Sequence, residues 1–223
     1  PVPFGPGTFR YEILDERGKI PLNALRGLDE ALAPLGINLL ERLGFAPDAA
    51  QQLLDRLNET PGRPIQQLGE LAALPGMTPE LLDRLAQRVT AAGAGPVNIN
   101  TAPAEVLTSL GLSSALAGRI TTLYRAGPGP DGIEGTSDDG ALTQPGQIQP
   151  VLSLNFGPLS PTDNACLTAL IRHNPPLLGV SSSFFRVESE GRAGRHGIRK
   201  KVTSVLQRNG SGVPPLTRGW HES

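Results

Sequence analysis

The sequence predicts an α+β protein in which a large helical domain is inserted into a small antiparallel sheet. Apolar and polar residues alternate at both ends of the 223-residue chain, as they do in half-buried strands. Between these ends the apolar spacing is helical. The simplest arrangement joins the terminal strands in one sheet. We therefore expect a discontinuous sheet domain of residues 1–20 and 179–223, with a helical domain of residues 21–178 inserted in it.

The first expected strand follows a leader rich in Pro and Gly, residues 1–7. In TFRYEILDERGKI, residues 8–20, three apolar residues alternate with charged residues: Phe9, Tyr11 and Ile13. This alternation predicts a strand with one dry face, and DERG predicts a turn at its end.

The apolar spacing becomes helical after this turn. PLNALRGLDEALAPLG, residues 21–36, predicts a first helix with Asn23 as a candidate cap. APDAAQQLLDRLNE, residues 46–59, predicts a second helix, because Pro and Asp stand at its start and Leu53 and Leu57 share one face.

Two similar segments follow, residues 64–93 and 101–127, and each is expected to form a helix, a Gly-containing turn and a second helix. We interpret them as tandem units of the helix-hairpin-helix or SAM-like type. The connector VNINTAPAEVL leads into the second unit. In it, Asn98 and Asn100 are expected to bond neighbouring backbone, and Thr101 to cap the next helix.

A loop over residues 127–146 precedes a last helix over residues 160–176, with Asp163 as a candidate cap. The alternation then returns. SSFFRVESEGR, residues 182–192, and GIRKKVTSVLQR, residues 197–208, predict a hairpin of two strands. A sheet of three short strands needs another element packed on its apolar face. We therefore expect such a covering element, which this sequence does not supply.

The loop contains the clearest chemical signal, the segment DGIEGTSDDG. Its carboxylates are Asp131, Glu134, Asp138 and Asp139. Its glycines allow the backbone to curl, so that carbonyl oxygens can join these carboxylates. Calcium prefers six to eight such oxygen ligands, although the spacing is not that of an EF-hand. The sequence predicts a calcium site here, against the alternative of a solvated acidic turn.

Nucleic-acid binding is the main alternative function, because hairpins of this type often grip phosphates through Gly-x-Gly turns. Here Thr78 and Ser113 replace the second glycine of the two turns. Their side chains are expected to cap the following helices, where a phosphate would otherwise bind. The net charge of −1 also lacks the basic balance of a DNA-binding domain. We expect no nucleic-acid partner.

Other functional classes leave little trace in the sequence. The three histidines are scattered, and no nucleophile elbow or phosphate-binding Gly-Lys loop is found, so we predict no catalytic residues and no enzyme. The single cysteine, Cys166, is expected to be a buried apolar residue. No run of about 20 apolar residues indicates a membrane span. Because the chain begins PVPFGPG without Met, we expect a soluble fragment of a longer protein.

Several segments, in this order, resemble a known family: DERGKIPLNAL, LGELAALPGMTPELLDRLAQRVT, VNINTAPAEVL, SSSFFRVESEGR and VTSVLQR. Over residues 9–208 the chain is similar to the type II secretion minor pseudopilin K family, also called general secretion pathway protein K. The resemblance implies a pilin-like sheet, an N-terminal hydrophobic helix packed on it, and an inserted helical domain with calcium sites.

The resemblance also implies a function. Members of this family cap the periplasmic pseudopilus together with minor pseudopilins I and J, start its assembly, and so serve protein transport across the outer membrane. The full-length precursor is expected in the periplasm, anchored in the inner membrane by the helix absent here. Secreted proteins are candidate partners. A minor pilin of a related type IV pilus system remains an alternative.

Overall fold

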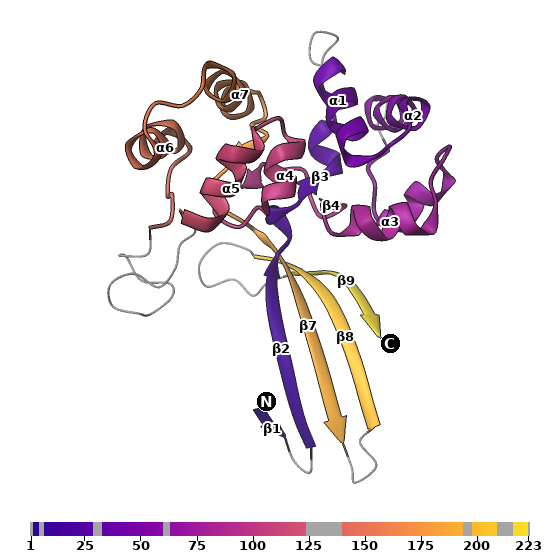
Figure 1. Cartoon of the computed structure of the whole chain (residues 1–223). Coiled ribbons are helices and arrows are strands. Elements are labelled where there is room, and N and C mark those ends of the chain that lie inside the picture. The colour runs from indigo at the N-terminus through magenta and orange to yellow at the C-terminus, as the bar shows by residue number, and fades with distance from the viewer. Residues whose placement is uncertain are drawn as a thin grey trace. The chain divides into compact units, whose positions relative to one another are not determined.

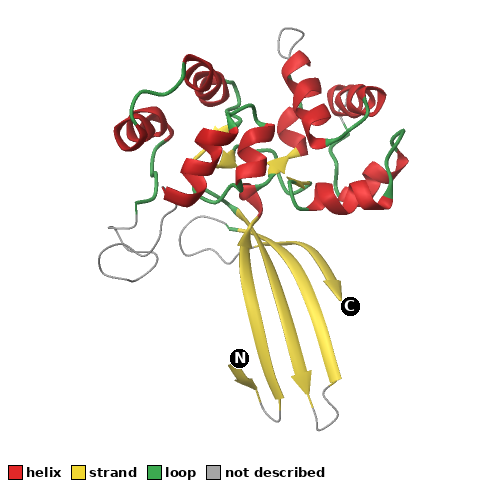
Figure 2. Ribbon diagram, viewed as in Figure 1, coloured by secondary structure: helices red, strands yellow, loops and turns green. Residues whose placement is uncertain are grey.

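The computed structural model describes residues 2–4, 7–28, 33–59, 63–123, 140–193, 198–208 and 216–222. It contains two compact units. The first, the sheet unit, combines Pro1–Glu16 with Ser182–Ser223, and the second, the helical unit, is Arg17–Ser181. The sequence predicted the boundaries between the two units after residues 20 and 178, and the structure places them after Glu16 and Ser181. Figures 1 and 2 show strands in the first unit and mostly helices in the second.

The sheet unit is a five-stranded antiparallel sheet in the order β1-β2-β7-β8-β9. Its strands are β1 (Val2–Phe4), β2 (Gly7–Asp15), β7 (Phe184–Ala193), β8 (Ile198–Gln207) and β9 (Leu216–Glu222). The early strand β2 pairs with the late strand β7, with Ile13 opposite Val187, so the terminal strands share one sheet as predicted.

The sequence predicted three strands for this sheet, so two of its five strands were missed. Both missed strands lie at the edges of the sheet. β1 has three residues and contains Pro3, whereas β9 contains Gly219 and pairs across a bulge between Val205 and Leu206. Pro and Gly weaken a strand pattern, and they are tolerated at edges and bulges.

The helical unit contains seven α-helices among the described residues. They are α1 (Ala33–Leu43), α2 (Pro47–Asn58), α3 (Pro79–Ala86), α4 (Ala104–Ser109), α5 (Ser114–Leu123), α6 (Ile148–Phe156) and α7 (Pro161–Arg172). The 3-10 segments in the described part of the chain are Glu16–Gly18, Leu22–Leu25, Leu68–Ala73 and Pro145–Gln147. No helix in the described part of the chain has the length and hydropathy to cross a membrane.

Two short parallel ladders connect distant parts of the helical unit. β3 (Ile20–Pro21) pairs with β4 (Val89–Thr90), and β5 (Val97–Asn98) pairs with β6 (Leu178–Gly179). Neither ladder was predicted. Each strand has two residues, which is too short for an alternating pattern to be visible in the sequence.

The predicted helix over residues 21–36 is wrong in its first part. The chain forms a 3-10 turn at Leu22–Leu25, Gly27 adopts a positive φ of 79°, and the described part of α1 is Ala33–Leu43. Asn23 is not a helix cap. Its buried side chain donates to the carbonyls of Ile65 and Ala91 and accepts from the Ile65 N–H.

The other predicted helices form, with local differences. α2 and the two helix–turn–helix segments are confirmed, and their turn glycines, Gly76 and Gly111, have positive φ angles of 70° and 108°. The first element of the first segment is a 3-10 turn rather than an α-helix. α6 was not predicted, since Pro150 and a nearly continuous apolar run hide its helical spacing.

Three of the predicted caps and contacts differ in the structure. Ser160, not Asp163, caps α7, because its side chain accepts from the Asp163 N–H. Thr101 does not cap α4, whose N-cap residue is Pro103. Asn98 bonds the neighbouring Asn100 N–H as expected, whereas the Asn100 side chain bonds the distant backbone of Leu142 and Val180.

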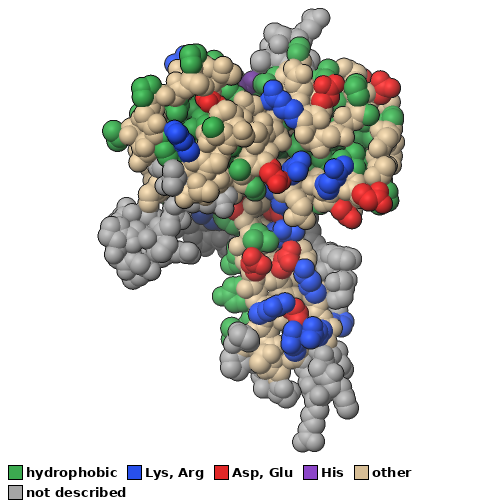
Figure 3. Space-filling model, viewed as in Figure 1, with side chains coloured by type: hydrophobic (Ala, Val, Ile, Leu, Met, Phe, Trp, Pro, Cys, Tyr) green, Lys and Arg blue, Asp and Glu red, His purple; other side chains and the backbone are tan. Residues whose placement is uncertain are grey.

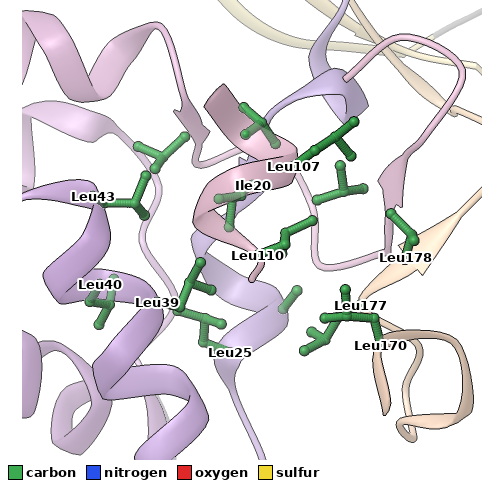
Figure 4. Close-up of a cluster of buried hydrophobic side chains, with 14 of the residues drawn as sticks. Ile20, Leu25, Leu39, Leu40, Leu43, Leu107, Leu110, Leu170, Leu177 and Leu178 are labelled. Carbon is green, nitrogen blue, oxygen red and sulfur yellow. The ribbon is translucent and has the colours of Figure 1, made fainter. Parts of the chain in front are cut away.

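The hydrophobic core of the helical unit is built mainly from leucine, as the low aromatic content of 4% predicts. Figure 4 shows core side chains from segments far apart in sequence, among them Leu39 of α1, Leu110 after α4 and Leu177 before β6. Cys166 is half-buried against this core, and burial raises the pKa of its thiol. Among the described residues, every member of this core lies in the helical unit.

Candidate functional site

The two faces of the sheet carry different chemistry, because successive residues of a strand point to opposite faces. The strand register places one set of residues together, which we call the apolar face. Its apolar members are Phe9, Tyr11 and Ile13 of β2, Phe185 and Val187 of β7, and Val202 and Leu206 of β8. The sequence predicted the alternation in each strand, and the register brings the three strands into one surface.

The apolar face is accessible, although the sequence predicted a dry face on β2. Tyr11 and Ile13 are each 58% exposed, and the Phe9 and Tyr11 rings stack with their centroids 6.2 Å apart. The described elements that lie wholly in the sheet unit are all strands, so none of them is a helix that covers this face. The other five apolar members of this face are half-buried. An apolar surface that is partly exposed in this way is a candidate interaction site.

The opposite face is charged. Figure 3 shows acidic and basic side chains interleaved over the strands. The ion pairs here are Arg10–Glu190, Arg192–Glu190, Arg186–Glu188, Lys201–Glu188 and Arg186–Glu16. Hydrogen bonds from Arg10 and Arg192 hold the pKa of Glu190 below its usual value. This face is therefore suited to water, and the apolar face is the candidate interaction surface of the sheet.

The predicted calcium ligands, Asp131, Glu134, Asp138 and Asp139, lie outside the described residues. Within the described ranges, no three His, Cys, Asp or Glu side chains gather as metal ligands would. The structure thus assigns no geometry to the predicted calcium site.

The two hairpin turns are occupied by protein groups rather than open to a phosphate. Thr78 accepts from the Leu81 N–H, and Ser113 accepts from the Leu116 N–H, so both hydroxyls cap their helices as predicted. At the second turn the Ser113 N–H donates to the carboxylate of Asp163 at 2.8 Å. A phosphate at this helix start would have to displace that carboxylate, which weakens the nucleic-acid alternative.

The role of Asp163 was missed. Its side chain is 6% exposed and also accepts from the Ser113 and Ser160 hydroxyls. The pattern from Ser160 to Asp163 resembles a capping box and signals a helix start. It gives no sign that the same carboxylate would bond Ser113, which is 50 residues away.

Comparison with known proteins supports the fold. No family model matches the sequence, and a search of curated proteins also finds no match. Among solved structures, the chain is similar to one in the GspK-GspI-GspJ complex of the type 2 secretion system of enterotoxigenic Escherichia coli. The match has a TM-score of 0.68 and 17% sequence identity, and it covers 100% of this chain and 82% of the other. The chain therefore has a GspK-like α+β fold.

Proposed function

We propose that this chain is the periplasmic part of a minor pseudopilin that, in the K position, caps the pseudopilus of a type II secretion system. It would act without catalysis, starting pseudopilus assembly for protein export across the outer membrane. The observation that carries the proposal is the structural match over the whole chain to a complex named for GspK, GspI and GspJ.

The apolar face supplies a physical reason for this role. A sheet with one apolar and one charged face needs a layer packed on the apolar side. We propose that this layer is an N-terminal helix of the full-length protein, which also anchors it in the inner membrane. The exposed Ile13 would then be buried by that helix or by a helix of a neighbouring subunit.

The test is assembly with the corresponding partners. The chain is mixed with the minor pseudopilins I and J of the same system, and the mixture is separated by size-exclusion chromatography with light scattering. A complex of fixed stoichiometry that contains all three chains is expected. If the three chains elute separately at every concentration tested, the proposed role is wrong.

A pair of variants on β2 tests the part played by the apolar face. Ile13 and Glu12 are neighbours on opposite faces of one exposed strand. If a helix covers the apolar face, Ile13→Ser should weaken the docking of that helix. The N-terminal helix is added as a peptide, and docking is measured as the solubility that the chain restores to the peptide or as co-elution of the chain with the peptide. Glu12→Ser serves as the matched control. Equal effects of both variants would remove the apolar face from the interface.

We further propose that Asp131, Glu134, Asp138 and Asp139 bind calcium, on the strength of their chemistry and spacing in the sequence. Ligand binding to the folded state stabilises it by about 2.7 kcal/mol at 100 times the dissociation constant. Calcium should therefore raise the melting temperature, and a chelator should reverse the change. Asp138→Asn with Asp139→Asn should abolish the shift, whereas the exposed Asp83→Asn should retain it. An unchanged melting temperature would refute the calcium site.

A further inference from the structure

Cations gather at one end of the sheet, where β2 begins, β7 ends and β8 begins. Three consecutive cross-strand rows lie there: Thr8–Arg192–Arg199, Phe9–Gly191–Lys200 and Arg10–Glu190–Lys201. We call the five cations of these rows the basic end: Arg10, Arg192, Arg199, Lys200 and Lys201. With Glu190 as the one carboxylate of the rows, the formal charge is 5 − 1 = +4. The whole chain carries −1, so the remaining residues carry −1 − 4 = −5.

The cations of the basic end are accessible. The side chains of Arg10, Arg192 and Lys201 are 68%, 48% and 50% exposed, and Arg199 and Lys200 are also exposed. Neighbouring strands are about 5 Å apart and successive rows about 3.4 Å apart. The backbone positions of the five cations therefore lie within about 12 Å of one another. This is close to the Debye length of about 10 Å at 0.1 M salt, so several of the cations attract an anion at this end of the sheet together.

The internal ion pairs leave this end positive. Glu190 is shared by Arg10 and Arg192, and Glu188 is shared by Lys201 and Arg186. Arg199 has no ion-pair partner among the described residues, and it lies directly opposite Arg192. Like charges opposite each other on adjacent strands destabilise a sheet. An external anion would remove this repulsion.

The positions of the cations indicate the shape of that anion. Lys200 lies on the apolar face, whereas the other four lie on the charged face, so the cations surround the end of the sheet from both sides. One row further along the apolar face is the exposed Tyr11, stacked on Phe9. A flat anionic surface can contact cations on both faces, and exposed aromatic rings beside cations are typical of protein segments at the headgroup level of a bilayer.

We propose that the basic end binds the anionic headgroups of a phospholipid bilayer, and that Tyr11 lies at the headgroup boundary. This inference goes beyond the proposed function and does not depend on it, since it rests on the charge and exposure of five cations in the sheet unit. An acidic soluble protein is the alternative partner of the basic end, but its binding would not require the aromatic pair Phe9 and Tyr11 beside the cations.

The experiment is co-sedimentation of the full 223-residue chain with vesicles. One set of vesicles is phosphatidylcholine alone, and in the other phosphatidylglycerol replaces part of it. Binding is expected only to the phosphatidylglycerol vesicles, and it should weaken as salt screens the charges. Poly-glutamate is added in a separate series as a soluble polyanion.

Matched variants assign the effect to the basic end. Each cation near an anionic surface contributes about fivefold in affinity, so Arg199→Gln with Lys200→Gln should lower vesicle affinity by about 25-fold. Arg199→Lys with Lys200→Arg should retain the affinity of the native chain. Arg84→Gln with Arg172→Gln, two exposed sites in the helical unit, makes the same change in net charge and should have little effect. Thermal melting checks that every variant is folded.

Three results would overturn the proposal. The first is no sedimentation with phosphatidylglycerol vesicles at low salt. The second is an equal loss of affinity in the basic-end and control variants. The third is binding to poly-glutamate without binding to vesicles, which would point to an acidic protein as the partner.

Discussion

The Asp163 carboxylate accepts a hydrogen bond of 2.8 Å from the backbone N–H of Ser113, which ties the start of α7 to the start of α5. The same carboxylate accepts from the hydroxyls of Ser113 and Ser160 at 2.9 and 2.8 Å. A buried negative charge at a helix N-terminus is favourable, because the N–H groups there are positive and lack intrahelical partners.

Replacing Asp163 should therefore destabilise the helical unit. In Asp163→Asn the amide cannot accept all three hydrogen bonds, and leaving a buried polar group unpaired costs about 1–3 kcal/mol. Urea unfolding should show a loss of this size. Asp83→Asn, on the exposed surface of α3, is the control and should change the free energy of unfolding by less than about 0.5 kcal/mol. Equal effects of the two variants would contradict the role of Asp163.

The same contact predicts a dependence of stability on pH. Burial raises the pKa of Asp163, but hydrogen bonds from the Ser113 N–H and from the Ser160 and Ser113 hydroxyls lower it more, so the pKa lies below its usual value. When the folded pKa is the lower one, the contribution to stability is present above the unfolded pKa, about 3.9, and is lost as the pH falls through the folded pKa.

The difference in free energy of unfolding between the native chain and Asp163→Asn should thus be constant near neutral pH and shrink below about pH 4. Urea unfolding of both proteins across this range measures it. A difference that grows as the pH falls would mean that the folded pKa is raised rather than lowered.

Local signals in the sequence predicted the elements that depend on local structure. Pro47 was expected at a helix start and opens α2, and Pro79 and Pro161 open α3 and α7 in the same way. Gly76 and Gly111 mark hairpin turns that need a positive φ. The alternation in β2, β7 and β8 likewise predicted three strands. These features could be predicted because neighbouring residues determine them.

The features that could not be predicted depend on distant partners. Leu22–Leu25 has helical spacing, but Asn23 in it bonds backbone that is 42 and 68 residues away. The candidate site shows the same limit. Each strand pattern predicted an apolar side, and the sequence of residues 192–201 is visibly basic. Only the register reveals that Arg10 of β2 joins these cations at one end of the sheet.

Asn23 provides a test of such a long-range contact. Its amide makes three hydrogen bonds with the backbone of Ile65 and Ala91, at 2.8 to 3.0 Å, and it is 9% exposed. Asn23→Ala leaves these backbone groups unpaired, so the free energy of unfolding should fall by roughly 3 kcal/mol or more. Asn38→Ala, on the exposed side of α1, is the control and should change it little. Comparable losses in denaturant unfolding would argue against the Asn23 contacts.

Two glycines should respond to alanine with opposite signs. Gly118 lies inside α5 and has a negative φ, and a Cβ there would have no neighbouring atom within 4 Å. Alanine is favoured over glycine in a helix interior by about 1 kcal/mol, so Gly118→Ala should raise the melting temperature.

Gly179 lies in β6, where a Cβ would come within 2.8 Å of Cγ and 3.1 Å of Cβ in the Pro96 ring. A proline ring cannot rotate away as a flexible side chain can, so the β5–β6 ladder must shift to relieve the clash. Overpacking of this kind costs about 1–3 kcal/mol, and Gly179→Ala should lower the melting temperature. Because both variants add the same methyl group, any general effect of alanine on the unfolded chain is shared. If both variants shift the melting temperature in the same direction, the packing described here for Gly118 or for Gly179 is wrong.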